Sequence, residues 1–226
     1  IREGATIDQV DEAYPGFYLR NKRKCDEYWV YQDLRRTKRA REAWPGRLVA
    51  ANPLDMAQQA ICAWINDAVG NPDLPFGTQQ LYIYGVTGML KTTFVRMLNR
   101  YFQIYTIPKT ETFYDFYNDG EYDFAFVDEF RSSLPLTWMN EWLGGSHMVL
   151  RKKGSQALKK QNIPTIIVSN YAPEDNYPEC PDVGREAFFR RLKVVHVVEP
   201  LHFTHETRES GEEYEQAQEV VESPSV

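Results

Sequence analysis

A glycine-containing segment followed by lysine and threonine is the part of the sequence best suited to chemistry. It runs Gly85-Val86-Thr87-Gly88-Met89-Leu90-Lys91-Thr92-Thr93, between an apolar run and a stretch with helical spacing. Its first glycine, its lysine and its threonine have the spacing of the phosphate-binding loop G-x-x-x-x-G-K-[ST], whose backbone N–H groups surround nucleotide phosphates at a helix N-terminus. We expect residues 85–93 to bind ATP. Lys91 would neutralise the β and γ phosphates, and the Thr92 hydroxyl would hold Mg²⁺.

The loop departs from this pattern at one position, where Leu90 replaces the glycine before the lysine. A side chain there restricts the loop and crowds the nucleotide, although Gly88 could supply flexibility two residues earlier. On the loop alone, a strand-turn-helix segment with a surface lysine is the alternative interpretation.

A pair of carboxylates, Asp128 and Glu129, follows the apolar run 124–127. Ligands of open α/β sheets bind where parallel strands end. We therefore expect Asp128 to hold the metal and Glu129 to activate the attacking water as general base. The alternative is a strand that ends in solvated acids. The presence of both this pair and the upstream loop favours an NTPase.

Two further polar groups follow apolar or helical segments. Asn170 ends the apolar strand 163–169 and could sense the γ-phosphate or position the water, with a helix cap or turn as the alternative. Arg190 and Arg191 precede a last strand. An arginine that reaches a neighbouring subunit's nucleotide stabilises transition-state charge by roughly 10³–10⁵ in rate. A solvated basic turn is the alternative for this pair.

Apolar strands alternating with helical stretches are expected to position these groups. Strands are predicted at 81–84, 103–107, 124–127, 163–169 and 192–198, with helices at 91–102, 134–143 and 186–191. This alternation is typical of an α/β fold with a parallel sheet covered on both faces. Upstream, residues 1–70 have helical spacing, and one helix is expected to open at 52–55. The pair Lys153-Gly154 predicts a hairpin tip within 146–160.

Charge and composition restrict the classes of protein. The 226 residues are 42% apolar and 26% charged, which is typical of a globular chain, and no run approaches the ~20 apolar residues of a membrane span. Residues 206–226 hold seven Glu and one Arg, which equals the whole net charge of −6. Basic clusters at 20–24, 35–41 and 151–160 therefore stay compatible with nucleic acid. Three scattered cysteines argue against a disulfide framework or a zinc site and favour the cytosol or nucleus.

The order of the motifs resembles that of the superfamily 3 helicases. More narrowly, the chain resembles the helicase half of the replication initiator (Rep) proteins of circular single-stranded DNA viruses of circovirus type. Segments 15–21, 105–108, 113–117, 168–173 and 186–191 are also similar, so the resemblance covers about residues 5–200. Leu90 is one departure, and Phe116 is another because relatives usually have glycine there.

This resemblance implies a P-loop ATPase of AAA+ type with a small N-terminal helical oligomerisation region. It also implies a hexameric ring, an arginine finger acting in trans, and 3′-to-5′ translocation on single-stranded DNA. The predicted hairpin would project into the channel and grip the phosphate backbone. Its DNA-binding candidates are His147, Arg151, Lys152 and Lys153, and a solvated basic face is the alternative. The host nucleus is the expected location. The relatives' metal-dependent nicking domain is expected to be absent, since no His pair precedes the loop.

We therefore expect three parts: a helical oligomerisation region at 1–74, an ATPase/helicase domain at 75–200, and an acidic disordered tail at 201–226. The predicted function is ATP-dependent DNA unwinding in the replication of a small circular genome. One alternative is a catalytically weak nucleotide- or DNA-binding oligomerisation module with a degenerate loop. A second is a cellular P-loop ATPase that remodels another protein, against which the lysine-rich hairpin argues.

Overall fold

The computed structural model describes residues 43–109 and 113–206. Three expectations lie outside these residues: the helices and basic clusters before residue 43, the family-like segment 15–21, and most of the acidic tail. None of the helices in the described part is long and apolar enough to cross a membrane.

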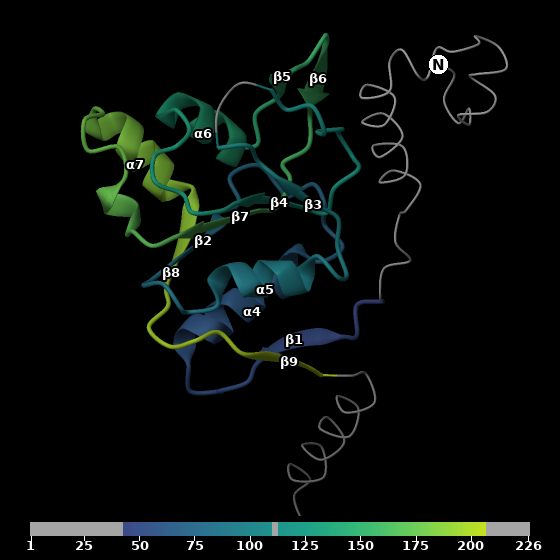
Figure 1. The fold of residues 1–226 in the computed structure, drawn as a ribbon, viewed down its shortest axis with the longest axis vertical. Coiled ribbons are helices and arrows are strands. Elements are labelled where there is room, and N and C mark those ends of the chain that lie inside the picture. Colours follow the sequence, from purple (N-terminus) through teal and green to yellow (C-terminus); the bar gives the residue numbers. More distant parts are fainter. Residues whose placement is uncertain (1–42, 110–112, 207–226) are drawn as a thin grey trace, which may run out of the picture. The chain divides into compact units, whose positions relative to one another are not determined.

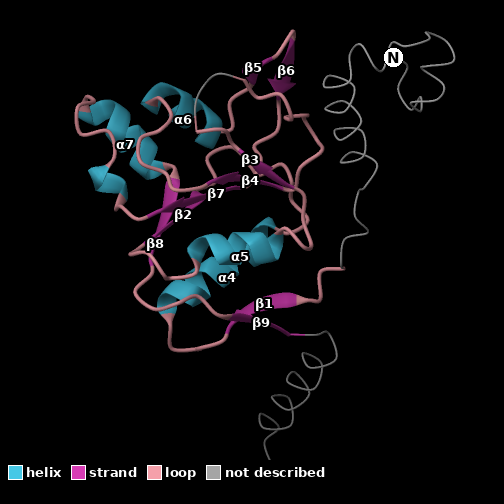
Figure 2. Cartoon of the chain, viewed as in Figure 1, coloured by secondary structure: helices cyan, strands magenta, loops and turns pink. Residues whose placement is uncertain are grey.

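A parallel sheet of five strands lies at the centre of the described unit, in the order β3-β4-β7-β2-β8 (Figures 1 and 2). Its strands are β2 (Gln80–Tyr84), β3 (Ile104–Thr106), β4 (Phe124–Val127), β7 (Thr165–Ser169) and β8 (Leu192–His196). Every neighbouring pair is parallel. Strands β4 and β7 are buried at every position, as expected when both faces of a parallel sheet are covered. The predicted α/β fold with a parallel sheet is confirmed.

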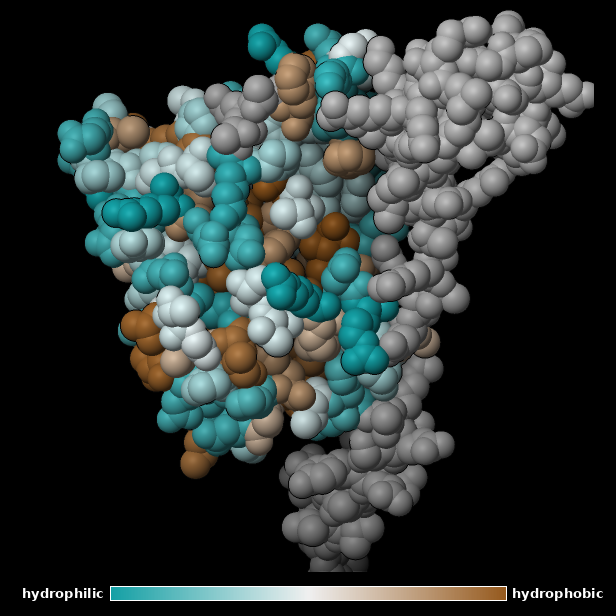
Figure 3. Space-filling model, in the orientation of Figure 1, coloured by the Kyte–Doolittle hydropathy of each residue, from teal (hydrophilic) through white to brown (hydrophobic). Residues whose placement is uncertain are grey.

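Helices cover both faces of this sheet. Figure 1 shows α4 (Met56–Ala68) and α5 (Lys91–Leu98) on one face, and α6 (Leu136–Leu143) and α7 (Asp182–Arg190) on the other. Side chains alternate between faces along each strand. In β2, Leu81 and Ile83 join the core under α4 and α5, whereas Tyr82 joins the core under α6 and α7. On the face seen in Figure 3, hydrophilic residues surround smaller apolar areas, which is ordinary for a folded surface.

Helix α4 begins where the sequence predicted, because Asp55 caps it. The Asp55 carboxylate accepts hydrogen bonds from the backbone N–H groups of Ala57 and Gln58 at 2.9 and 3.0 Å. Trp64 of this helix lies in the same core as the sheet, and its indole donates to the Gln79 carbonyl at 2.8 Å. The compact unit starts at Ala43. Residues 43–74 are therefore part of the same unit as the sheet, whereas the sequence predicted a domain boundary between residues 74 and 75.

Two short strands differ from the expectation. β1 (Arg47–Ala50) lies in a region predicted to be helical, and β9 (Phe203–Glu206) lies in the predicted disordered tail. They pair antiparallel, with Leu48 opposite His205. The physical reason is burial: Leu48 is fully buried, and the Phe203 ring packs 4.5 Å from that of Phe94. Such long-range pairing has no local signal in the sequence.

The predicted hairpin is confirmed. It consists of β5 (Met148–Lys152) and β6 (Ser155–Lys159), which pair antiparallel with Lys152 opposite Ser155. The turn is Lys153-Gly154, and Gly154 has a φ of 79°, a conformation that favours glycine. In Figure 1 the hairpin projects beyond the sheet on the side of β3. A short 3-10 helix, η1 (Pro173–Asp175), follows β7.

Candidate nucleotide-binding site

Three segments that are far apart in the sequence meet at the carboxyl edge of the sheet. The loop 85–90 follows β2, Asp128 follows β4, and Asn170 follows β7. Because β4, β7 and β2 are neighbours and parallel, their carboxyl ends lie side by side. Such an edge is where open α/β sheets bind ligands.

Lys91 is buried at this edge, with only 6% of its surface exposed. Its ammonium donates to the carbonyls of Gly85 and Val86 at 2.7 and 2.9 Å and to the Asn170 side-chain oxygen at 3.2 Å. Burial lowers the pKa of Lys91, and the charge of Asp128 opposes that shift. The structure therefore brings together Lys91, the loop and Asn170, all three of which the sequence singled out.

Thr92 and Asp128 are also in direct contact. The Thr92 hydroxyl donates to the Asp128 carboxylate at 2.9 Å, across 36 residues of sequence. A hydroxyl and a carboxylate oxygen at this separation are the ligand types that Mg²⁺ takes, and two protein ligands leave positions for water and phosphate oxygens. These residues fit a magnesium ion bound together with a nucleotide. Among the described residues, no group of three His, Cys, Asp or Glu side chains is arranged to hold a metal by itself.

The backbone of the loop explains why its glycines and its leucine matter. A Cβ on Gly85 would lie 2.2 Å from the Val197 carbonyl oxygen, so only glycine fits. Leu90 has a φ of 57° and a ψ of 19°, the left-handed region, at the position where the motif has glycine. A leucine there costs about 1–2 kcal/mol. Gly88 also has positive φ, at 94°, but it does not relieve the conformation of Leu90.

Glu129 has a partner that the sequence did not reveal. The Lys109 ammonium lies 2.6 Å from its carboxylate, and both side chains are largely exposed. The hydrogen bond and the charge of Lys109 lower the pKa of Glu129, so the carboxylate stays ionised at neutral pH. The only sequence signal for Lys109 was its place shortly after the strand that pairs with β4. Glu129 has to release Lys109 before its carboxylate can accept a proton from water.

Arg190 and Arg191 lie at the opposite, amino edge of the sheet. The Arg191 carbonyl accepts from the backbone N–H of Gln80, the first residue of β2, at 2.8 Å. The Arg191 guanidinium donates to the Ala187 carbonyl at 2.6 Å, and burial lowers its pKa, while Arg190 is exposed. Neither arginine is part of the Lys91 site of the same chain.

The four predicted DNA contacts on the hairpin are not equally available. Arg151, Lys153 and His147 are exposed, whereas Lys152 is half-buried and its ammonium donates to the Asn118 side chain at 2.8 Å. Lys159, in the same basic stretch, is fully buried with its ammonium 4.9 Å from the Trp142 ring centre. Burial lowers the pKa of Lys159 to about 8.

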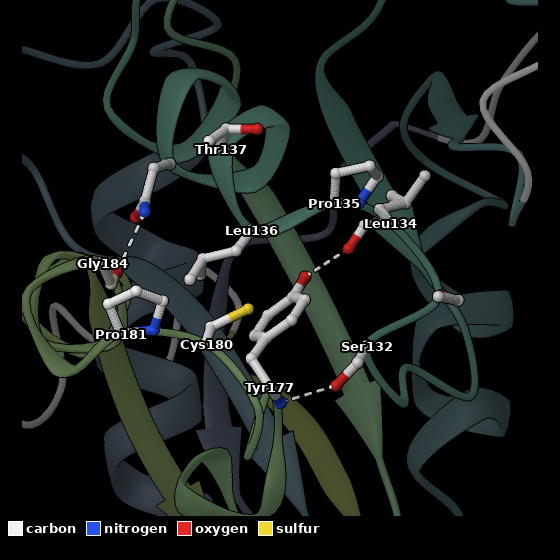
Figure 4. A pocket seen from close by; sticks show the side chains of 11 residues that line it. Ser132, Leu134, Pro135, Leu136, Thr137, Tyr177, Cys180, Pro181 and Gly184 are labelled. Atoms are coloured by element: carbon white, nitrogen blue, oxygen red, sulfur yellow. Dashed lines mark hydrogen bonds between the residues drawn. The ribbon is translucent and has the colours of Figure 1, made fainter.

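A pocket of about 750 Å³ lies beside α6 and α7, and none of the predicted site residues lines it (Figure 4). Tyr177 crosses it, donating its hydroxyl to the Leu134 carbonyl at 2.6 Å and its backbone N–H to the Ser132 hydroxyl at 2.9 Å. Residues from two distant segments form its lining, so no local motif could have predicted it.

Comparison with known proteins identifies no family for this chain. No protein-family model matches the chain, and no curated protein matches it. Among solved structures, one match is a "putative primosome component from Streptococcus pyogenes serotype M3", with 10% identity and a TM-score of 0.43. That match covers 67% of this chain and 85% of the other. The chain is an α/β protein whose parallel central sheet is consistent with a P-loop-type fold.

Proposed function

We propose that this chain is an ATP-hydrolysing P-loop domain of AAA+ type that acts on single-stranded DNA. The observation that carries the proposal is the 2.9 Å hydrogen bond between Thr92 and Asp128. It joins the last position of the phosphate-loop pattern to the carboxylate expected to share its metal. The alternative interpretations, in which Lys91 is a surface lysine and Asp128 is a solvated acid at a strand end, would not require that contact.

In this proposal each residue at the carboxyl edge of the sheet has a distinct role in binding or hydrolysing ATP. Lys91 exchanges the loop carbonyls for oxygens of the β and γ phosphates, and Asn170 remains beside it to sense the γ-phosphate. Thr92 and Asp128 would hold magnesium, and the ion would offset the negative charge that develops on the phosphate oxygens. Glu129 releases Lys109 and accepts the proton of the attacking water.

The position of the arginines supports action between copies of the chain. Arg190 and Arg191 are at the amino edge of the sheet, so they cannot complete the Lys91 site of their own chain without refolding. In the hexameric ring implied by the resemblance to viral Rep helicases, one of them would reach the site of a neighbour. Helicase activity in the host nucleus belongs to the same proposal.

The hairpin is the proposed contact with DNA. Arg151 and Lys153 are exposed at and beside its tip, while its buried face anchors it through Met148 and Leu150. Contact with phosphates alone predicts binding that tolerates sequence and weakens with salt, with a log–log slope of about −0.7 per phosphate on a single strand.

A catalytically weak nucleotide- or DNA-binding module is the second candidate. Two observations favour it: the strained backbone of Leu90 and the ion pair that occupies Glu129. In that case nucleotide binds without turnover.

Steady-state ATP hydrolysis with and without single-stranded DNA separates these candidates. For a motor, we expect DNA to raise the rate, Lys91→Ala to abolish it, and Arg96→Ala, an exposed change on the same helix, to leave it unchanged. Nucleotide binding without hydrolysis, at concentrations that permit assembly, would favour the weak module. Absence of Mg²⁺-dependent nucleotide binding would refute the motor and leave only the DNA-binding form of the second candidate.

A further inference from the structure

A second, smaller pocket lies beside the hairpin. Its volume is about 310 Å³, at the lower end for sites that bind small molecules. Four aromatic side chains line it: Tyr105, Phe113, Phe116 and Tyr122. Asp115 lines it as well. None of these residues belongs to the proposed nucleotide site.

The wall of this pocket is tied directly to the tip of the hairpin. The Asp115 carboxylate accepts a hydrogen bond from the backbone N–H of Lys153, in the turn. The neighbouring Tyr114 donates its backbone N–H to the Arg151 carbonyl at 2.7 Å. The exposed cations and the aromatic pocket are therefore held together in one local unit.

The same segment is tied to the base of the hairpin. Asp119 accepts hydrogen bonds from the backbone N–H of Lys160 at 2.9 Å and from the Tyr117 hydroxyl at 2.9 Å. Contacts at both tip and base fix the segment 113–119 along the hairpin. A single DNA strand that contacts the exposed cations Arg151 and Lys153 would pass beside the pocket.

Two of the rings that line the pocket leave apolar surface exposed. The side chains of Phe113 and Phe116 remain 45% and 60% exposed, although such rings are usually buried. Tyr105 is only 4% exposed, and its hydroxyl has no hydrogen-bond partner among the described residues. That hydroxyl is itself fully buried, so what Tyr105 offers a ligand in the pocket is part of its ring.

We propose that this pocket holds one nucleobase of the single strand whose phosphates contact the hairpin. Aromatic rings beside a cationic track are how single-stranded nucleic acids are bound, because every base has a face that can stack. The proposal rests on the DNA-binding part of the proposed function and adds a base contact to it. The Asp115 carboxylate, an acceptor, favours bases with an exocyclic amino group, so cytosine or adenine is preferred to thymine.

Fluorescence anisotropy with labelled oligonucleotides of one length tests this. The whole chain would be titrated into oligo(dC), oligo(dT) and an oligonucleotide with abasic sites, each over a series of salt concentrations. We expect oligo(dC) to bind more tightly than the abasic strand by about tenfold or more, and oligo(dT) to fall between them. The salt slopes of the three should agree, since the phosphate contacts are the same.

Two variants separate base from phosphate contacts. Phe116→Ala should reduce affinity for oligo(dC) to that for the abasic strand, without altering the salt slope. Lys153→Ala should reduce the dependence of affinity on salt concentration and leave the preference for oligo(dC) over the abasic strand unchanged. Phe76→Ala removes an exposed phenylalanine outside the pocket and should change neither. Tyr105→Phe keeps the ring and removes only a buried hydroxyl, so it should leave the preference for base-containing strands unchanged.

The outcomes are distinguishable. If no oligonucleotide binds, the proposed DNA-binding function and this inference both fail. If binding is salt-sensitive and depends on Lys153, but intact and abasic strands bind equally, DNA binding stands and the base pocket is wrong. Equal weakening of all strands by Phe116→Ala would show that the segment only supports the hairpin. A change in oligomeric state without an effect on DNA would assign the pocket to a second copy of the chain.

Discussion

The two edges of the central sheet use similar polar residues in opposite ways. At the amino edge, Gln80, Asn162 and Thr165 are buried and bond to one another or to nearby backbone. At the carboxyl edge, Asn170 and Glu129 are exposed. Gln80, Asn162 and Thr165 hold the fold together, whereas Asn170 and Glu129 stay within reach of a ligand. Residue type alone does not separate a structural group from a functional one.

The largest expected effect concerns the arginines that lie at the edge opposite the site. We expect Arg190→Ala or Arg191→Ala to reduce ATP hydrolysis by roughly 10³-fold or more, if the arginine acts on a neighbouring copy. Mixing the inactive arginine variant with Lys91→Ala should then restore part of the activity, because some sites combine an intact Lys91 with an intact arginine. Mixtures that stay inactive, measured as steady-state hydrolysis, would refute action between copies.

A matched pair of substitutions tests the contrast between the edges directly. Asp128→Asn should lower Mg²⁺-dependent hydrolysis by at least about 10²-fold while the melting temperature stays nearly constant. Asn162→Ala leaves the Pro75 carbonyl and the Gln80 amide without their partner, and should cost about 1–3 kcal/mol of unfolding free energy. Urea unfolding and hydrolysis rates measured on both variants check this. If Asn162→Ala lowers the hydrolysis rate without lowering the unfolding free energy, Asn162 is not a structural group and the contrast between the two edges is wrong.

A pH effect is expected from Lys159 under the hairpin. Burial lowers its folded-state pKa from 10.5 to about 8, while the charges of Asp119 and Asp73 oppose the shift. Between these two values Lys159 binds more protons in the unfolded chain than in the folded chain, so this group alone makes stability rise with pH from about 8 towards 10. Burial raises the pKa of Cys62 from 9.0 to about 12, which lowers stability above pH 9 in both chains. Thermal stability should therefore rise more, or fall less, with pH in the native chain than in Lys159→Met. An unchanged pH dependence in the variant would rule out Lys159 as its source.

The smallest effect is expected in the phosphate loop. Leu90→Gly removes the left-handed strain and should raise the unfolding free energy by up to about 1 kcal/mol, because the greater freedom of glycine in the unfolded chain offsets part of the gain. Chemical denaturation with and without nucleotide measures it. If nucleotide affinity also improves, Leu90 impairs the site. A loss of stability would mean that the leucine side chain contributes contacts that outweigh its backbone cost.

Local signals were sufficient for most elements of the fold, but not for β1 and β9. The apolar run 124–127 is a buried strand, Asp55 caps a helix, and Lys153-Gly154 forms a hairpin turn, because each depends on neighbours in sequence. Boundaries were less exact: the helix predicted to reach residue 102 ends at Leu98. The pairing of β1 with β9 was missed, since it joins segments more than 150 residues apart.

For the candidate site, the sequence by itself determined the types and order of the groups: a loop with Lys91 and Thr92, then Asp128, then Asn170. Parallel strands then bring these groups to one edge, which follows from the alternation of strands and helices. Only the tertiary structure decided which basic residues remain available, because burial depends on packing between distant segments. It buries Lys159 against Trp142, pairs Lys109 with Glu129, and separates Arg191 from the loop by the length of a strand.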